Sequence, residues 1–176
     1  LLIREQARAA GLEMRTVELP ADASNEEYND VMNDVVEKYT EDGYDTVVFG
    51  DINLESVRSY REDRLRGRSL DGRWVLWERD TGKTARDFVA EFGATVVCVD
   101  SESFDDPERF VGREFDAAFL EDLPNDVDPC GENGEFHTFV HGAPFFDYSV
   151  EFEPGEYVER EVRDGRLVYC DLVPPG

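Results

Sequence analysis

Residues 128–144, DPCGENGEFHTFVHGAP, gather side chains that could carry acid–base chemistry. Two carboxylates, Glu132 and Glu135, flank a tight turn and could face one pocket. There they could act as a base, orient an amine or ammonia, or hold a Mg²⁺-bound water. In the strand expected after the turn, Glu135 and His137 lie on one face. The glycines of the segment permit positive φ angles and a close approach of the backbone to a ligand. The segment is therefore the first candidate site.

Three more interpretations of this segment stay open. Cys130, His137 and His141 could bind zinc, but residues i and i+4 of a strand lie about 13 Å apart, so the spacing predicts no metal site. Cys130 could act as a nucleophile, although nothing in the sequence indicates an activated thiol. The third interpretation is a purely structural turn.

A second candidate site follows an apolar strand in VVFGDINLESVRSYRE, residues 47–62. Gly50 and Asp51 come directly after the strand, and Glu55, Arg58 and Glu62 then share one helical face. In open parallel sheets, ligands bind beyond the carboxyl ends of the strands. The simpler interpretation is a turn carboxylate followed by a solvated row of salt bridges.

Two shorter motifs resemble this arrangement. VVCVD also ends in a carboxylate, Asp100. LWERDT places Arg79 and Asp80 where they could either clamp a ligand or form a capping turn.

Apolar periodicity predicts alternating helices and strands up to residue 123. The expected helices span 1–10, 26–41, 54–65 and 81–92, and the expected strands span 14–19, 45–50, 73–77 and 94–100. From residue 124 onward strands dominate: 135–140, 148–153, and the pair 156–163 and 166–173, joined by an Asp-Gly turn. We expect an α/β fold in which residues 1–123 form a Rossmann-like parallel sheet with helices on both faces. Residues 124–176 should form a smaller β-rich substrate-binding portion.

The chain is strongly acidic, since 42 Asp and Glu against 18 Lys and Arg give a net charge of −24. Lys38 and Lys83 are its only lysines. An acid excess with few lysines is typical of proteins that work in very high salt, where the Debye length falls to about 3 Å. The competing interpretation is an acidic interaction protein. Because this charge repels phosphate backbones, we expect no nonspecific nucleic-acid binding.

Composition also indicates where the protein works. No apolar run approaches the roughly 20 residues of a membrane span, so no membrane partner is expected. Three cysteines without a CxxC pair favour a reducing cytoplasm. The chain opens inside an expected helix and without Met, and we expect its natural start to lie upstream.

Several stretches of the sequence resemble the diphthine–ammonia ligase family, an adenine nucleotide alpha hydrolase-like group of the PP-loop ATP pyrophosphatases. They are FGDINLESVRSYRE, LWERDT, FVGREFD and above all LPNDVDPCGENGEFHTFVHGAPFF. The resemblance implies a Rossmann-like nucleotide-binding domain followed by a smaller substrate domain. It also implies ATP-dependent amide formation, in which ATP with Mg²⁺ adenylates a carboxylate, pyrophosphate leaves and ammonia attacks. The implied acceptor is diphthine on elongation factor 2 or another small carboxylate.

Two features depart from the family pattern. Residues 1–176 contain no SGGKDS phosphate loop, so we expect an N-terminally truncated chain that does not complete the reaction by itself. Members that make diphthamide carry an acidic Glu-Gly-Gly-Glu-aromatic-Glu motif, whereas here His137 replaces the last Glu. This resembles a paralogous branch, for which cobalamin salvage has been suggested. Three further functional interpretations stay open: ATP α-hydrolysis, a non-catalytic nucleotide-binding module, and a decayed fragment that keeps the fold.

The resemblance implies roles for residues at matching positions. The expected catalytic residues are Glu132, Glu135 and His137. The expected substrate-binding residues are Cys130, Gly131, Asn133, Gly134, Thr138 and Arg113. The expected nucleotide-binding residues are Gly50, Asp51, Glu55, Arg58 and Arg79.

Overall fold

A computed structural model describes residues 1–20, 23–162 and 165–176, which divide into two compact units. Unit 1 comprises residues 1–14 and 80–176, and unit 2 comprises residues 15–79. The predicted boundary near residue 123 falls inside unit 1, because residues 85–123 share one apolar core with strands that follow them.

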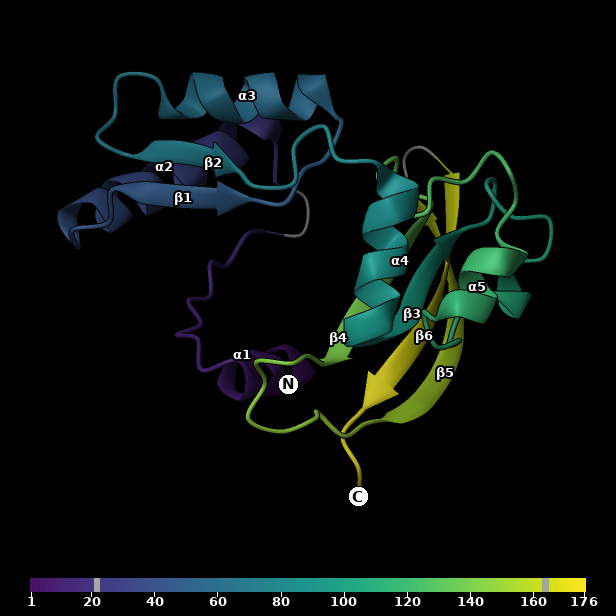
Figure 1. Cartoon of the computed structure of the whole chain (residues 1–176). Helices are drawn as coiled ribbons and strands as arrows, with labels where there is room; N and C mark the ends of the chain where they lie inside the picture. Colours follow the sequence, from purple (N-terminus) through teal and green to yellow (C-terminus); the bar gives the residue numbers. More distant parts are fainter. Residues whose placement is uncertain (21–22, 163–164) are drawn as a thin grey trace. The chain divides into compact units, whose positions relative to one another are not determined.

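Unit 1 is built on a four-stranded antiparallel sheet (Figure 1). In spatial order its strands are β4 (Phe136–Gly142), β3 (Gly93–Asp100), β6 (Gly165–Val173) and β5 (Glu153–Val162). β3 pairs antiparallel with both β4 and β6, so the prediction that residues 94–100 extend a parallel sheet is wrong. A continuous apolar run is typical of a parallel strand covered on both faces. β3 has the same run because it lies inside an antiparallel sheet that is also covered on both faces.

Helices cover the two faces of this sheet. On one face, α4 (Thr81–Glu91) and α5 (Ala117–Asp122) pack on a core that contains Phe115, Phe119 and Phe136. On the other face, α1 (Leu2–Ala9) packs on Phe139 and Val150. A short 3₁₀ helix, η1 (Pro107–Arg109), precedes α5.

Unit 2 contains the parallel strands β1 (Thr46–Phe49) and β2 (Asp71–Trp74), together with α2 (Asn25–Glu41) and α3 (Glu55–Leu65) (Figure 1). α2 begins at a capping box in which the Ser24 hydroxyl accepts the Glu27 N–H and the Glu27 carboxylate accepts the Ser24 N–H. The predicted α/β class is confirmed: a parallel sheet flanked by helices is joined to a separate β-rich portion.

Three predicted strands differ from the structure. Residues 14–19 are exposed and form no strand, because an alternating pattern yields a strand only where a partner strand can pair with it. β5 begins only at Glu153, so residues 148–152 are not part of a strand. β2 ends at Trp74, where a turn replaces the rest of the predicted strand 73–77. The predicted Asp-Gly turn includes Asp164, which lies outside the described residues.

Candidate functional site

The 128–135 loop is organised from inside by the carboxylate of Glu135, which is only 6% exposed. Its Oε1 accepts the Asp128 N–H at 3.0 Å and the Asn133 side-chain amide at 2.9 Å. Its Oε2 accepts the Asn133 N–H at 2.9 Å. The Glu135 carbonyl accepts the Asp100 N–H at 2.8 Å, which joins the loop to the end of β3. Three N–H groups therefore fix this carboxylate in the loop interior.

Asp128 is a second anchor at the start of the loop. Its Oδ1 accepts the N–H of Cys130 at 2.8 Å and that of Glu132 at 3.4 Å. Its carbonyl accepts the Gly131 N–H at 2.9 Å. Nothing in the family resemblance singled out Asp128, although its position at the head of DPCGENGE could have indicated an anchor for the backbone that follows.

Gly131 allows the loop to turn tightly against β4. Its φ is +66°, and a Cβ at this position would lie 2.7 Å from the Phe136 carbonyl oxygen. Gly134 also has a positive φ, of +89°, but a Cβ there would meet nothing within 4 Å. At position 131, both the positive φ and the lack of space for a Cβ require glycine. At position 134, only the positive φ favours glycine.

Cys130 has the properties of a structural thiol. It is half-buried, and its Sγ donates to the Thr81 carbonyl at 3.3 Å, which ties the loop to the start of α4. Burial, together with the negative charges of Asp128 and Glu132, raises the pKa of the Cys130 thiol to about 11. Since the thiolate is the nucleophilic form, this environment disfavours the nucleophile interpretation.

Glu135 and His137 do not share one environment, contrary to the face predicted from strand alternation. β4 begins at Phe136, so Glu135 belongs to the loop and turns inward, whereas His137 is exposed on β4. Around the buried anchor, Asn133 is exposed, and Glu132 and Thr138 are half-buried. Glu132 and His137 are therefore the predicted catalytic groups that a ligand at this loop can reach.

The zinc interpretation finds no support within residues 1–20, 23–162 and 165–176, where no three His, Cys, Asp or Glu side chains cluster as metal ligands. His141 contacts a different partner: its Nε2 lies 3.2 Å from Oε1 of Glu114, and its ring lies against Phe152 at a centroid distance of 5.3 Å.

The side chain of Arg113 contacts α5 rather than the 128–135 loop. Its guanidinium donates to Asp122 at the end of α5 at 2.9 Å and lies over the ring of Phe119. This hydrogen bond, with the charges of Arg109 and Arg113, lowers the pKa of Asp122. The contacts indicate that Arg113 stabilises α5, and its predicted substrate-binding role stays a prediction.

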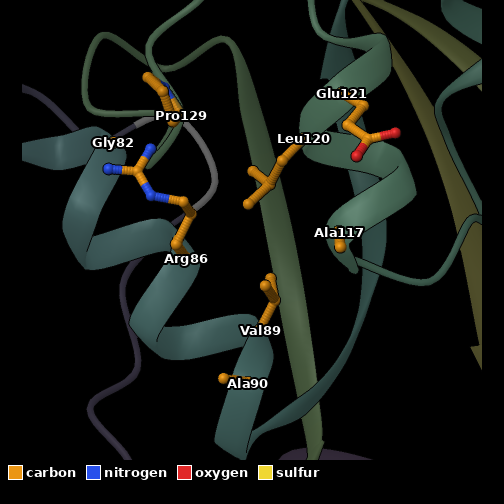
Figure 2. Close-up of a pocket in the computed structure, with 8 residues that line it drawn as sticks. All are labelled: Gly82, Arg86, Val89, Ala90, Ala117, Leu120, Glu121 and Pro129. Carbon is orange, nitrogen blue, oxygen red and sulfur yellow. The ribbon is translucent and has the colours of Figure 1, made fainter.

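Unit 1 also contains a groove between α4 and α5, with a volume of about 500 Å³ (Figure 2). Pro129 of the 128–135 loop lines it, together with Arg86 and Val89 of α4 and Leu120 of α5. The spacing of Gly82, Arg86, Val89 and Ala90 places these residues on one face of α4. That spacing is the signal by which the sequence could have indicated the groove.

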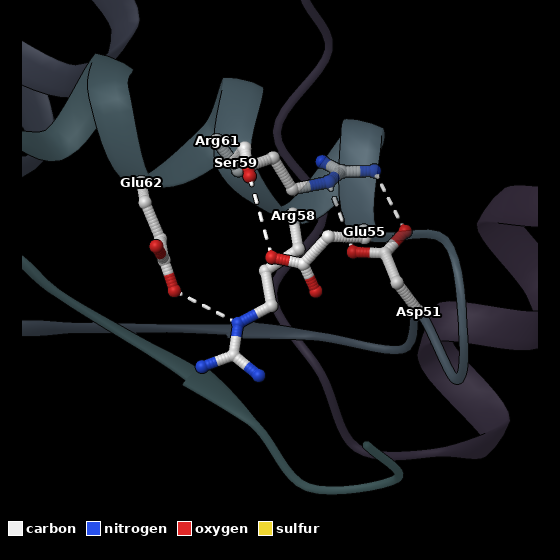
Figure 3. Close-up of polar contacts among 6 residues, drawn as sticks. All are labelled: Asp51, Glu55, Arg58, Ser59, Arg61 and Glu62. Carbon is white, nitrogen blue, oxygen red and sulfur yellow. Dashed lines mark hydrogen bonds and ion pairs between the residues drawn. The ribbon is translucent and has the colours of Figure 1, made fainter. Parts of the chain in front are cut away.

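The second candidate site lies in unit 2, where Asp51 follows β1 (Figure 3). Arg61 of α3 holds the Asp51 carboxylate: Nη2 donates to Oδ1 at 3.3 Å, and Nε forms an ion pair with Oδ2 at 3.0 Å that lacks hydrogen-bond geometry. The same guanidinium lies over the ring of Phe49 at 4.6 Å. Gly50, next to Asp51, is exposed.

The remaining predicted residues of α3 also contact one another. Arg58 pairs with Glu62 at 2.8 Å, and its guanidinium lies over the Trp77 ring at 4.5 Å. The Ser59 hydroxyl donates to Glu55 at 3.5 Å (Figure 3). This is the row of salt bridges and polar contacts that the simpler interpretation of the motif predicts.

The LWERDT segment forms a turn that ends in a helix cap. Asp80 caps α4 by accepting the Lys83 N–H, and Arg79 is exposed. Glu78 adopts a positive φ of 58°, and its N–H donates to the Ile52 carbonyl at 2.9 Å, which joins the loops after β1 and β2. Asp100 likewise serves a turn, accepting the Ser103 hydroxyl at 2.7 Å.

The charged residues at the second candidate site are largely paired with one another. Asp51 and Glu55 carry the same sign of charge as phosphate, while Arg58 and Arg61 are already paired with Glu62 and Asp51. No glycine-rich phosphate loop occurs within residues 1–176. Binding of ATP and Mg²⁺ by this edge of the parallel sheet stays a prediction.

Comparison with known families finds a match over the second half of the chain. A family model described as diphthamide synthase C-terminal domain matches residues 80–168, just over half of the chain. The curated proteins contain no match to the chain. In the part of the chain that the structure describes, no helix has the length and apolar character needed to cross a membrane.

Proposed function

Since the chain belongs to the diphthamide synthase family, we propose that it supplies the acceptor-binding side of an ATP-dependent amide-forming ligase in diphthamide biosynthesis. The matched residues 80–168 lie in unit 1 and include the whole 128–135 loop. The proposed acceptor is a carboxylate, either diphthine on elongation factor 2 or another small carboxylate, and ammonia is the proposed nitrogen donor.

The observation that carries the proposal is the internal organisation of the 128–135 loop. The side-chain carboxylates of Glu135 and Asp128 together accept five hydrogen bonds from N–H groups of the loop, so the loop backbone is fixed before any ligand arrives. A site held in this way binds a ligand with little cost of ordering. Glu135 is thus a positioning residue, and Glu132 and His137 are the groups available to the acceptor.

ATP acts as a substrate in this proposal, and its role is to turn the acceptor carboxylate into an acyl group whose leaving group is AMP. The lone pair of ammonia forms the new C–N bond, the bond from the acyl carbon to the AMP oxygen breaks, and one proton of the attacking nitrogen must be removed. We assign acceptance of that proton to Glu132, a half-buried carboxylate of the loop, and contact with the acceptor to His137, which is exposed on β4.

Nucleotide titration and product analysis in molar KCl test the proposal. The assay compares residues 1–176 with a chain extended upstream, supplied with ATP, Mg²⁺, ammonia and a diphthine-bearing acceptor. We expect AMP and pyrophosphate release that depends on both ammonia and acceptor in the extended chain, and loss or strong slowing of this release in Glu132→Gln. Release of AMP that depends on neither would favour simple α-hydrolysis. Failure of both chains to bind ATP would overturn the nucleotide part of the proposal.

A further inference from the structure

The groove between α4 and α5 has the size and lining of a small-molecule site. Its volume of about 500 Å³ falls within the range of ligand pockets in proteins. Its apolar lining comes from both helices: Val89 and Ala90 from α4, and Ala117 and Leu120 from α5 (Figure 2). An apolar ligand surface of matching size would be removed from water on both sides.

Arg86 places a positive charge at this apolar groove. In the part of the chain that the structure describes, Arg86 forms no ion pair, whereas its neighbour on α4, Lys83, pairs with Asp87. The chain carries 42 acidic against 18 basic residues, so acidic partners for an arginine are abundant. The Arg86 side chain is exposed, and a guanidinium without an ion pair that lines an apolar groove can bind an anionic ligand group.

The guanidinium of Arg86 lies close to Gly82. A Cβ at position 82 would lie 3.3 Å from Nη1 of Arg86, which is tight for a side-chain contact. In Figure 2 the guanidinium extends back along α4 toward Gly82 and Pro129, at one end of the groove.

A negative charge lies on the α5 side of the groove. Glu121 of α5 also lines the groove, and in Figure 2 Leu120 lies between it and Arg86. Glu121 disfavours an anion on the α5 side and so sets an orientation. The anionic group should lie at Arg86 and the apolar body over Val89 and Leu120.

We propose that the groove between α4 and α5 binds a small ligand with an apolar body and one anionic group, held by Arg86. Pro129 lines the groove and also belongs to the 128–135 loop. A ligand in the groove therefore lies beside the loop that we propose binds the acceptor. Binding in the groove needs neither ATP nor ammonia, so the inference can hold or fail independently of the proposed ligase activity.

Two fluorescent probes with the same rings test the proposal on the full chain. Anilinonaphthalene sulfonate carries the anionic group, and phenylnaphthylamine lacks it. We expect the sulfonate to bind more tightly than the neutral probe, and to shift the backbone amide resonances of Ala90, Ala117 and Leu120. Arg86→Gln should weaken sulfonate binding about three- to fivefold and leave the neutral probe unchanged, as expected for loss of one exposed charge pair.

Glu121→Gln is the matched control, since it removes the opposite charge of the same groove. It should leave sulfonate binding equal or stronger. The folded state of each variant is checked by its melting temperature. Equal affinities for the two probes, an unchanged sulfonate affinity in Arg86→Gln, an equal loss in Glu121→Gln, or amide shifts outside the groove would each overturn the proposal.

Discussion

At the residue scale, Glu132 and Glu135 lie three positions apart in the sequence and have different environments. Glu135 is buried and accepts three hydrogen bonds within its own loop, whereas Glu132 is half-buried at the loop surface. The sequence shows two carboxylates flanking a turn, but the direction of each side chain depends on where β4 begins. Because β4 begins at Phe136, Glu135 turns inward as an anchor.

Removing the Glu135 carboxylate should destabilise unit 1. Glu135→Ala leaves the Asp128 and Asn133 donors without their partner, and we expect a loss of about 2–3 kcal/mol in the free energy of unfolding. Chemical denaturation followed by circular dichroism measures the change. Glu132→Gln in the same loop is the control and should cost less. Equal stability of Glu135→Ala and the parent chain would contradict the anchoring role.

The Cys130 thiol should make stability depend on alkaline pH. Its pKa is raised from 9.0 to about 11, chiefly by burial, so the folded chain retains a proton that the unfolded chain releases. The stability contributed by the neutral thiol is fully present below pH 9.0 and is lost as pH rises toward 11. Cys98 and Cys170, with pKa values also raised by burial, act in the same direction.

Denaturation midpoints measured at a series of pH values between neutrality and the alkaline limit test this prediction. Cys130→Ser keeps a donor for the Thr81 carbonyl but does not ionise in this range. Its stability should therefore fall less steeply with pH than that of the parent chain. An identical slope in the two chains would show that the Cys130 environment does not perturb ionisation.

At the scale of elements, the 128–135 loop depends on glycine in two different ways. Gly131→Ala should destabilise the chain by about 2–3 kcal/mol, since it combines backbone strain with a contact of 2.7 Å to the Phe136 carbonyl. Gly134→Ala has open space and should cost only about 1 kcal/mol of strain. Melting temperatures of the two variants provide the comparison, and a Gly134→Ala variant as unstable as Gly131→Ala would contradict the steric argument.

Element type could be predicted from the sequence more reliably than strand pairing. The helix over residues 26–41 was predictable because Ser24 and Glu27 provide a capping box before an apolar stripe. The partners of β3 were not predictable, since an apolar run is compatible with a parallel or an antiparallel neighbour. Residues 14–19 show that alternation without a pairing partner does not make a strand. The groove was missed because its lining combines two helices that are distant in sequence.

At the scale of the whole molecule, the net charge of −24 should dominate the response to salt. Several basic side chains pair with acidic ones, as Arg58 does with Glu62 and Arg166 with Glu159. Because the chain has 42 acidic and only 18 basic residues, most of its acidic side chains have no basic residue to neutralise them. Screening of this repulsion favours the compact state.

We therefore expect the melting temperature to rise between about 0.1 M and about 2 M KCl, as the Debye length falls from about 10 Å to a few ångströms. Differential scanning calorimetry measures it directly. Sucrose at matched osmolarity serves as the control for effects of solvent exclusion without screening. A melting temperature that does not change with KCl would contradict the adaptation to high salt inferred from composition.

We propose that the 128–135 loop and its neighbours form the acceptor side of an amide-forming ligase, in a chain that belongs to the diphthamide synthase family. The most direct measurement is mass spectrometry of a diphthine-bearing elongation factor 2 after incubation with ATP, Mg²⁺, heavy-nitrogen ammonia and the upstream-extended chain. We predict that heavy nitrogen enters the acceptor as an amide, and that Glu132→Gln abolishes or strongly slows its entry. An acceptor that stays a carboxylate while ATP is converted to AMP, or one amidated equally well by Glu132→Gln, would contradict this role of the loop.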